Sequence, residues 1–194
     1  MSSSHRIRQY LRHLRKAKGR HGVHSPFVYS FTDYLLKKKH GEQSKLVLLT
    51  RRNKRLVNEV IAYFDCKYIL WLSDSLNARG TFLTFDRQEA GEVKIGSSAF
   101  EFEEAETFPA PDMLLIDIND PGDWLAAFNK YGRLLRQEGI ILINSIHYTR
   151  KHTEAWQEVI AEEPVRLSLD LFKLGLLLFR EEFKEKQHFV LKSK

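Results

Sequence analysis

The sequence predicts an α/β protein built on a mostly parallel sheet that helices cover on both faces. Two observations carry this prediction. From residue 68 onward, short and continuously apolar runs recur, and amphipathic segments of helical period lie between several of them. Strands without a polar face are typical of a sheet buried on both sides, and helices between them are the usual crossovers of parallel strands. With 194 residues, of which 43% are hydrophobic and 29% charged, the chain suits one globular domain with a short appendage.

The apolar runs place the strands, and the spacing of the other apolar residues places the helices. Four buried strands are predicted at residues 68–72, 81–85, 113–116 and 140–143, followed by closing strands of antiparallel character at residues 165–170, 174–180 and 188–191. Helices are predicted at residues 27–38, 56–64, 125–135 and 153–161. Pro26 favours an extended residue before it and a helix that begins near it.

The positive charge is concentrated near the N-terminus. The formal net charge is +6, but residues 1–60 carry 15 Lys and Arg against three acids, whereas residues 61–194 carry 16 against 22. The chain is therefore divided into a basic helical segment at residues 1–55 and a mildly acidic α/β domain at residues 56–194.

The first helix is basic and amphipathic. Ile7, Leu11 and Leu14 recur at helical spacing, and six cations lie among and after them: Arg6, Arg8, Arg12, Arg15, Lys16 and Lys18. Such a helix can pack its apolar stripe on its own body, bind nucleic acid, or lie on an acidic membrane surface. We favour packing on the body, whose charge is complementary. Residues 5–20 and 51–55 remain a candidate surface for nucleic acid or another acidic partner.

Composition excludes several classes of protein. The single cysteine, Cys66, rules out a disulfide framework and a multi-cysteine zinc site, and it fits a reducing compartment. The longest apolar run, at residues 174–179, is far shorter than the roughly 20 residues of a membrane-spanning helix. The basic N-terminus lacks the apolar core of a secretory signal. We therefore expect a cytoplasmic protein.

The chain resembles class I S-adenosylmethionine-dependent methyltransferases, and more narrowly a group of small bacterial members, in the order of its elements and in four strings. These are KGRHGVHSPF at residues 18–27, DMLLID at 112–117, EGIILINSIHY at 138–148, and the closing pattern from LDLFKLGLLLFR to HFVLK. The resemblance covers nearly the whole chain. It implies a three-layer, Rossmann-like sheet with strand one at residues 68–72, strands four and five in the second and third strings, and antiparallel strands six and seven at the end.

The resemblance also implies a cofactor site after strand one, where this chain departs from the family. The family has an acid and then a glycine-rich turn there, and an acid after strand two binds the ribose. Here Trp71 stands in the acid's place, and Ser73 and Asn77 stand in the glycines' places. The S-adenosylmethionine would then lie over four residues: Ser73, Asp74, Ser75 and Asp86.

The chain between strands one and four is shortened. Only eight residues run from Ser73 to Gly80, whereas a parallel crossover with its helix needs about a dozen or more. Either the first crossover helix is lost and residues 81–85 pair differently, or these residues are not strand two. The cofactor motif is therefore truncated and degenerate.

The resemblance places the substrate near Asp117 and His147. Metal-dependent relatives carry an acid after strand four and an acidic pair after strand five, because a hard divalent cation prefers several carboxylate oxygens. Asp117 occupies the first position, but Asn144 and Ser145 are neutral at the second, so no metal is expected. His147 is either a general base for a substrate hydroxyl or a strand-end histidine bonded to the backbone.

Two functions are compatible with these residues. The first is an S-adenosylmethionine-dependent methyltransferase that acts on a small-molecule hydroxyl, with His147 and Asp117 facing the substrate. The second is a catalytically inactive protein of the same fold that binds a partner, nucleic acid or acidic lipid through its basic N-terminal face. The extent of the resemblance favours the first, and the lost glycines and missing crossover favour the second.

Overall fold

The computed structural model describes residues 2–19, 25–37, 53–73, 80–84 and 109–192. Its helices are α1 (Ser2–Lys16), α2 (Pro26–Lys37), α3 (Lys54–Phe64), α4 (Trp124–Tyr131) and α5 (Arg150–Ala161), with short 3-10 turns η4 (Pro121–Asp123) and η5 (Gly132–Leu134). Its strands are β1 (Tyr68–Ser73), β2 (Gly80–Thr84), β3 (Met113–Asp117), β4 (Ile140–Asn144), β5 (Leu167–Asp170), β6 (Leu174–Leu178) and β7 (Gln187–Val190). The predicted elements are thus present, with ends shifted by a few residues.

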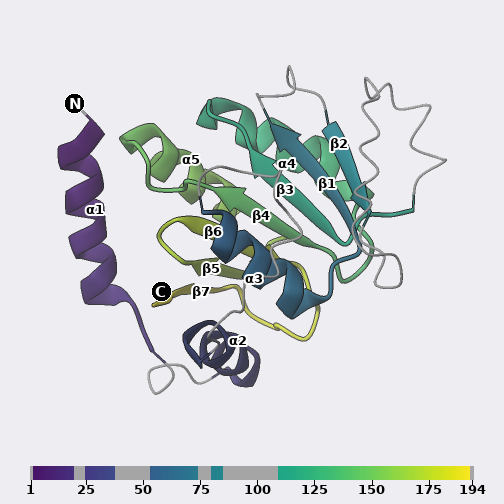
Figure 1. Cartoon of the computed structure of the whole chain (residues 1–194), viewed down its shortest axis with the longest axis horizontal. Helices are drawn as coiled ribbons and strands as arrows, with labels where there is room; N and C mark the ends of the chain where they lie inside the picture. The colour runs from purple at the N-terminus through teal and green to yellow at the C-terminus, as the bar shows by residue number, and fades with distance from the viewer. Residues whose placement is uncertain (1, 20–24, 38–52, 74–79, 85–108, 193–194) are drawn as a thin grey trace.

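The strands form one mixed sheet in the order β2-β1-β3-β4-β6-β5-β7 (Figure 1). β1, β3 and β4 are parallel neighbours, which confirms the parallel centre. β6 lies between β4 and β5 and is antiparallel to both. For β5 and β6 this orientation is expected, because only three residues connect them. The last strand differs from the prediction, because β7 runs parallel to β5 and not antiparallel.

Helices cover both faces of this sheet, so the three-layer prediction is confirmed. On one face, side chains of α2 and α3 share a core with Ile69, Trp71 and their neighbours on alternate positions of the strands. On the other face, Trp124, Phe128 and Trp156 from α4 and α5 pack on the intervening positions. In Figure 1, α3 lies in front of the sheet and α4 and α5 lie behind it. Successive strand residues point to opposite faces, which is why every strand position in the centre is apolar.

The pairing of β2 shows how the strand after β1 joins the sheet. It runs antiparallel to β1, with Thr84 beside Tyr68 and Gly80 beside Leu72. The strand that follows β1 therefore returns along it as a hairpin partner and does not cross over to a parallel position. This pairing agrees with the alternative in which the predicted strand at residues 81–85 pairs differently, for its described part up to Thr84.

The N-terminal helix is held by a face that we did not predict. Ile7, Leu11 and Leu14 are 58%, 52% and 47% exposed, so the interpretation that this apolar stripe packs on the body is wrong. Instead His13 is buried and His5 is half-buried on the side that meets the body. After the helix, the Lys18 N–H donates to Val190 and the Lys18 carbonyl accepts from Lys192, so the chain lies along β7. In Figure 1, α1 stands at one side of the molecule, apart from the helices that cover the sheet.

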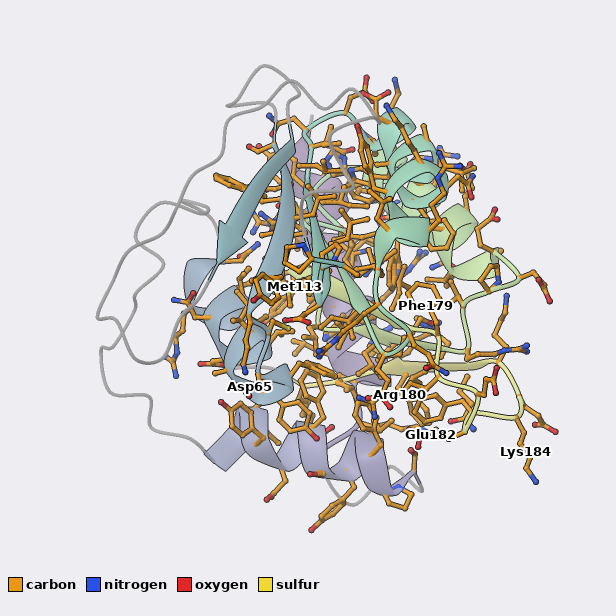
Figure 2. The ribbon with its side chains drawn as sticks, turned by 90° about the vertical axis from the view of Figure 1, so that its right-hand side faces the viewer. Asp65, Met113, Phe179, Arg180, Glu182 and Lys184 are labelled. Atoms are coloured by element: carbon orange, nitrogen blue, oxygen red, sulfur yellow. The ribbon has the colours of Figure 1, made fainter. Side chains whose placement is uncertain are left out.

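The second helix packs more conventionally. Val28, Phe31 and Leu35 are almost fully buried in the same core as α3 and the sheet, and an aromatic cluster forms around Phe27, Phe31, Tyr63 and Phe64. The Arg180 guanidinium lies 5.5 Å from the centre of the Phe27 ring. Figure 2 shows Arg180 and Glu182 near α2, while Lys184 points away from the body. Within the described residues, no helix has both the length and the apolar character needed to cross a membrane.

Candidate functional site

Three polar side chains meet at the carboxyl edge of the parallel strands. Ser73, Asp117 and Asn144 are the last residues of β1, β3 and β4, and Ser73 pairs with Asp117 in the register of β1 and β3. Asn144 follows the paired residues Ile116 and Ile143 of β3 and β4. Ligands of doubly wound folds bind outside this edge, so the position is the first one to test for a site.

Hydrogen bonds connect this edge internally. The Asn144 side-chain amide donates to Asp117 Oδ1 at 2.7 Å, and its oxygen accepts from the Asn53 amide at 2.7 Å. Asn53 precedes α3 with φ of 60°, a left-handed conformation that asparagine tolerates better than most residues. Asn144 is buried, and both its side-chain NH2 group and its side-chain oxygen make hydrogen bonds within the protein. The Asn53–Asn144–Asp117 chain ties the start of α3 to the ends of β3 and β4.

The structure brings together only part of the predicted cofactor and substrate site. Ser73 and Asp117 are neighbours, as the resemblance implies. Asp74, Ser75 and Asp86 lie outside the described residues. Thr84, the last residue of β2, pairs with Tyr68 at the amino end of β1, whereas Ser73 is at the carboxyl end. In the described part of the chain, β2 therefore ends at the edge opposite the candidate site.

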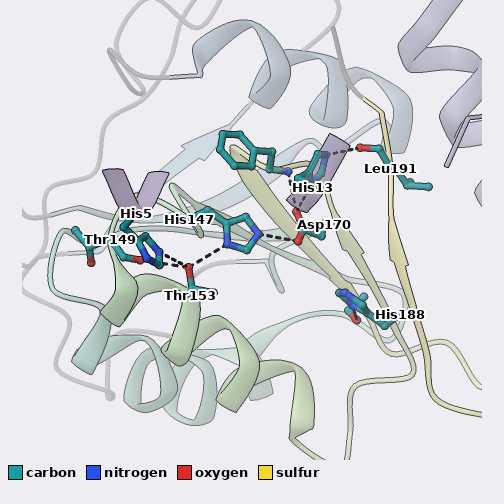
Figure 3. A network of polar contacts seen from close by, with 10 residues as sticks. His5, His13, His147, Thr149, Thr153, Asp170, His188 and Leu191 are labelled. Carbon is teal, nitrogen blue, oxygen red and sulfur yellow. Dashed lines mark hydrogen bonds and ion pairs between the residues drawn. The ribbon is translucent and has the colours of Figure 1, made fainter. Parts of the chain in front are cut away.

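His147 belongs to a second polar cluster, centred on Asp170 at the end of β5 (Figure 3). His147 Nε2 lies 2.7 Å from Asp170 Oδ2, and His13 Nδ1 lies 3.3 Å from Asp170 Oδ1. All three side chains are more than nine-tenths buried. Figure 3 shows Asp170 between the two imidazoles, one from the loop after β4 and one from α1. One carboxylate thus joins the N-terminal helix to the sheet.

The hydrogen bonds to Asp170 stabilise its charged form. Burial by itself raises the pKa of the Asp170 carboxyl, but hydrogen bonds from His13 and His147 and from the Phe172 backbone N–H outweigh burial and lower the pKa below its ordinary value of 3.8. The Phe172 N–H donates to Oδ1 at 2.8 Å, from a residue with φ of 64°. A buried carboxylate with this many donors is a strong anchor.

The imidazoles extend the cluster in two directions. His13 Nε2 lies 3.1 Å from the Leu191 carbonyl oxygen, next to the point where the chain after α1 meets β7. On the other side, His147 Nδ1 and His5 Nε2 lie 3.1 Å and 3.3 Å from Thr153 Oγ1. The helix α1 is therefore attached at two imidazoles that are two turns apart.

This geometry favours an anchoring role for His147. A general base needs a ring nitrogen that can reach a substrate proton. Both nitrogens of His147 already lie within hydrogen-bonding distance of protein oxygens, on Asp170 and Thr153. The ring is also buried against Phe172, at 5.6 Å between centroids. Within the described residues, no group of three or more His, Cys, Asp and Glu side chains is placed to hold a metal ion.

A cavity of about 560 Å³ lies between the start of α2 and the turn that joins β6 to β7. It is lined by Phe27 and Phe183 together with charged side chains such as Glu182 and Lys184. Since Leu178 at the end of β6 pairs with Ile140 at the start of β4, this cavity belongs to the amino edge of the parallel strands. It is therefore separate from the Ser73–Asp117–Asn144 edge and contains none of the predicted site residues.

Sequence reasoning missed Asn53, His5, His13 and Asp170. A signal for the first helix was present, because His5, Gln9 and His13 recur every four residues and so define one face. Asp170 had a weaker signal as the acid that ends an apolar strand. Nothing local in the sequence indicates that Asn53 adopts a left-handed conformation and reaches Asn144, 91 residues away.

Comparison of the chain with protein-family models, with curated proteins and with solved structures finds no match. The structure shows a mixed α/β sheet covered by helices on both faces.

Proposed function

We propose that this chain is a methyltransferase-like α/β scaffold that binds an acidic partner through helix α1. The observation that carries the proposal is the orientation of α1. Its histidine face is fastened to the body through Asp170 and Thr153, while Arg8, Arg12 and Arg15 remain exposed. A helix anchored in this way presents its cations on a fixed surface.

The strand order supports the methyltransferase-like part of the proposal. From β1 onward, the order β1-β3-β4-β6-β5 corresponds to strands 1-4-5-7-6 of the family order 3-2-1-4-5-7-6. The antiparallel β6 between β4 and β5 corresponds to the reversed strand seven. Beyond β1, the family has parallel strands two and three, whereas this chain has the antiparallel β2. This is the side of the sheet that supports the nucleotide in the family. On the other side, β7 lies beyond β5 and has no counterpart in the family order.

Charge-dependent binding tests the proposal. We expect an exposed patch of three arginines to bind anionic probes, here a DNA duplex and phosphatidylserine vesicles, at physiological salt. Changing Arg8, Arg12 and Arg15 together to Gln should weaken binding to the preferred probe about 100-fold, since each cation near an acidic surface contributes about 1 kcal/mol. The matched control changes three cations that are exposed elsewhere, Lys67→Gln, Arg133→Gln and Lys184→Gln. Equal losses in both triple variants, or no binding to either probe, would contradict the proposal.

A second candidate is transfer of a methyl group from S-adenosylmethionine to a small-molecule hydroxyl. It is favoured by one observation, the gathering of Ser73, Asp117 and Asn144 at the edge where such folds bind ligands. In that reaction the sulfonium would supply the methyl group and leave as S-adenosylhomocysteine, and Asp117, at that edge, would take the hydroxyl proton.

Titration calorimetry with S-adenosylmethionine and S-adenosylhomocysteine separates the two candidates. We expect neither compound to release heat at millimolar concentration, because the chain lacks the glycine turn that admits the cofactor. Micromolar binding of both, weakened by Asp86→Ala, would instead establish the enzyme. The Lys67→Gln variant serves as the control, since it leaves both edges of the sheet unchanged.

A further inference from the structure

Helix α1 has three faces with different chemistry. At about 100° per residue, Ile7, Leu11 and Leu14 fall within an arc of about 60°. The face that is fastened to the body, around His5 and His13, lies nearly opposite. The arginines at positions 8, 12 and 15 occupy the arc next to the apolar one. The apolar face is therefore turned away from the body and has cations along one side.

The apolar face is also the main apolar surface of the described chain. Of the five large apolar side chains that are exposed among the described residues, four lie on α1, namely Ile7, Tyr10, Leu11 and Leu14, at 46% to 58% exposure. Of these, Tyr10 contacts the body through an edge-on ring contact with Phe172 at 5.0 Å. The three aliphatic side chains remain as a contiguous stripe along roughly two turns. Single exposed apolar residues are ordinary, but a stripe with a charged rim indicates an interaction site.

We propose that this stripe inserts into the surface of an anionic lipid bilayer, with α1 lying in the plane of the interface. The inference rests on the proposed function, because it identifies the acidic partner. Interfacial helices have this division into an apolar face and a face rich in Arg and Lys, the first entering the acyl boundary and the second meeting acidic headgroups. Here the long side chains of Arg8, Arg12 and Arg15 can reach headgroups from beside the inserted stripe.

The charge and the residue types favour a bilayer over nucleic acid. A nucleic acid duplex would engage the arginines but leave the aliphatic stripe against water or phosphate. Single strands bind by stacking on aromatic rings, and Tyr10 is the one aromatic residue on α1. A bilayer, by contrast, accommodates both the apolar face and its cations.

A second copy of the chain fits the stripe less well. Two α1 helices that met antiparallel through Ile7, Leu11 and Leu14 would bring two rows of three arginines alongside each other. Like charges held at that distance oppose association. An acidic bilayer has the opposite charge, so charge complementarity selects it.

The anchor on the body makes the stripe available in a fixed orientation. His13 and His147 share Asp170, and the chain after α1 is hydrogen-bonded along β7 at Lys18. Unlike a free peptide, α1 therefore does not need to fold at the membrane. Insertion would bury surface that is exposed in the protein, without unpacking the core.

A fluorescent probe on the stripe tests the insertion directly. Cys66 is the single cysteine of the chain, it is buried, and burial raises the pKa of its thiol to about 12, so a new surface cysteine can be labelled selectively. We expect an environment-sensitive dye on Leu11→Cys to shift its emission to shorter wavelength when phosphatidylserine-containing vesicles are added. The same dye on Lys184→Cys, which is exposed on the β6–β7 turn, should not shift.

A charge-neutral variant gives the quantitative test. Changing Ile7, Leu11 and Leu14 to Ser keeps every cation. It should weaken binding to phosphatidylserine vesicles on the order of 100-fold, or about fivefold for each half-exposed side chain. Tyr29→Ser, at an apolar residue that is 43% exposed on α2, is the matched control and should bind as the unaltered protein does. Circular dichroism and the melting temperature should be unchanged in both, because these side chains are exposed.

The outcomes separate this inference from the proposed function. Vesicle binding that is lost in the serine variant, together with the dye shift, supports insertion. Vesicle binding that depends on the arginines but not on the stripe overturns insertion and leaves the proposed function standing. Preference for a DNA duplex, or loss of a dimer in the serine variant without vesicle binding, also overturns it. Binding to no anionic probe overturns both.

Discussion

The carboxyl edge of the sheet and the helix α1 use their polar groups in opposite ways. At the edge, Asn144 bonds both to Asp117 and to Asn53, so groups that could meet a ligand hold the protein together. On α1, the histidines bond to the body, and the arginines and aliphatic side chains face solvent. The usual ligand position of this kind of sheet is thus internally connected, whereas the appended helix presents a surface.

The difference bears on where a partner would be expected to bind. In a doubly wound sheet, crossover connections open a crevice at the carboxyl ends. The antiparallel β2 follows β1 without such a crossover, and Asn53 reaches the edge from the start of α3. We infer that the helix, and not the edge, is the part that contacts a partner.

Removing the shared carboxylate should have the largest effect. Asp170→Ala leaves His13 and His147 buried without their acceptor, and we expect a loss of about 3 kcal/mol in the free energy of unfolding. Urea unfolding measures the loss, and hydrogen exchange should show faster exchange in residues 5–16. Glu154→Ala, which removes an exposed acid of α5, is the control. A change below about 0.5 kcal/mol would show that Asp170 does not anchor α1.

Acid should break the same anchor without a mutation. The pKa of Asp170 is lower in the folded protein than its ordinary value of 3.8, so its ionised form stabilises the fold at neutral pH. That contribution, on the order of 2 kcal/mol, is present above about pH 4 and is lost progressively as the pH falls below that. Urea unfolding between pH 5 and pH 3 should lose stability more steeply in the unaltered protein than in Asp170→Asn. Equal slopes would contradict the assignment.

Disrupting the carboxyl edge should lower the free energy of unfolding less than Asp170→Ala does, and it should leave α1 in place. Asn144→Ala removes the donor to Asp117 and the acceptor for Asn53, with an expected loss of about 1 to 2 kcal/mol. Ser145→Ala removes only a long contact of 3.4 Å and is the control. If Asn144 were kept for a ligand at the expense of stability, its replacement would leave stability unchanged or raise it. Chemical denaturation distinguishes these results.

The smallest effect is expected at the outer end of the anchor. Thr153→Val removes the hydroxyl that His5 and His147 share, for a loss of about 0.5 to 1 kcal/mol. Burial lowers the pKa of His5, so protonation of His5 is less favourable in the folded protein, and stability should rise with pH near neutrality. We expect the protection factors at the start of α1, which compare each exchange rate with the intrinsic rate at the same pH, to rise between pH 5.5 and pH 7.5, and His5→Gln should remove this dependence. Unchanged exchange in Thr153→Val would place the attachment at His13 alone.

Much of the fold could be predicted, because the strands and helices have local signals. The runs at residues 69–72, 113–116 and 140–143 are apolar at every position, and a sheet with a core on each face requires that pattern. The short connection from Ser73 to Gly80 also limited the pairing of the next strand. Of the candidate site residues, Ser73 and Asp117 lie side by side, because both end parallel strands.

The face of α1 could not be chosen from its periodicity. The helix has an apolar stripe at Ile7, Leu11 and Leu14 and a histidine stripe at His5, Gln9 and His13, both with helical spacing. If the buried apolar area alone decided which face of α1 packs on the body, the aliphatic stripe would be that face. The histidine stripe is the one that meets the body because Asp170 stands buried at the end of β5 and needs donors, which aliphatic side chains lack.

The sequence by itself determined the two-sided core, the parallel centre and the concentration of cations in the first helix. Each of these depends on residue type and short-range spacing. Only the tertiary structure decided that Asn53 completes the carboxyl edge, that His147 bonds to Asp170, and that α1 turns its apolar side outward. These contacts join residues 23 to 178 positions apart, and a buried carboxylate or amide selects its partners by their geometry in the folded protein.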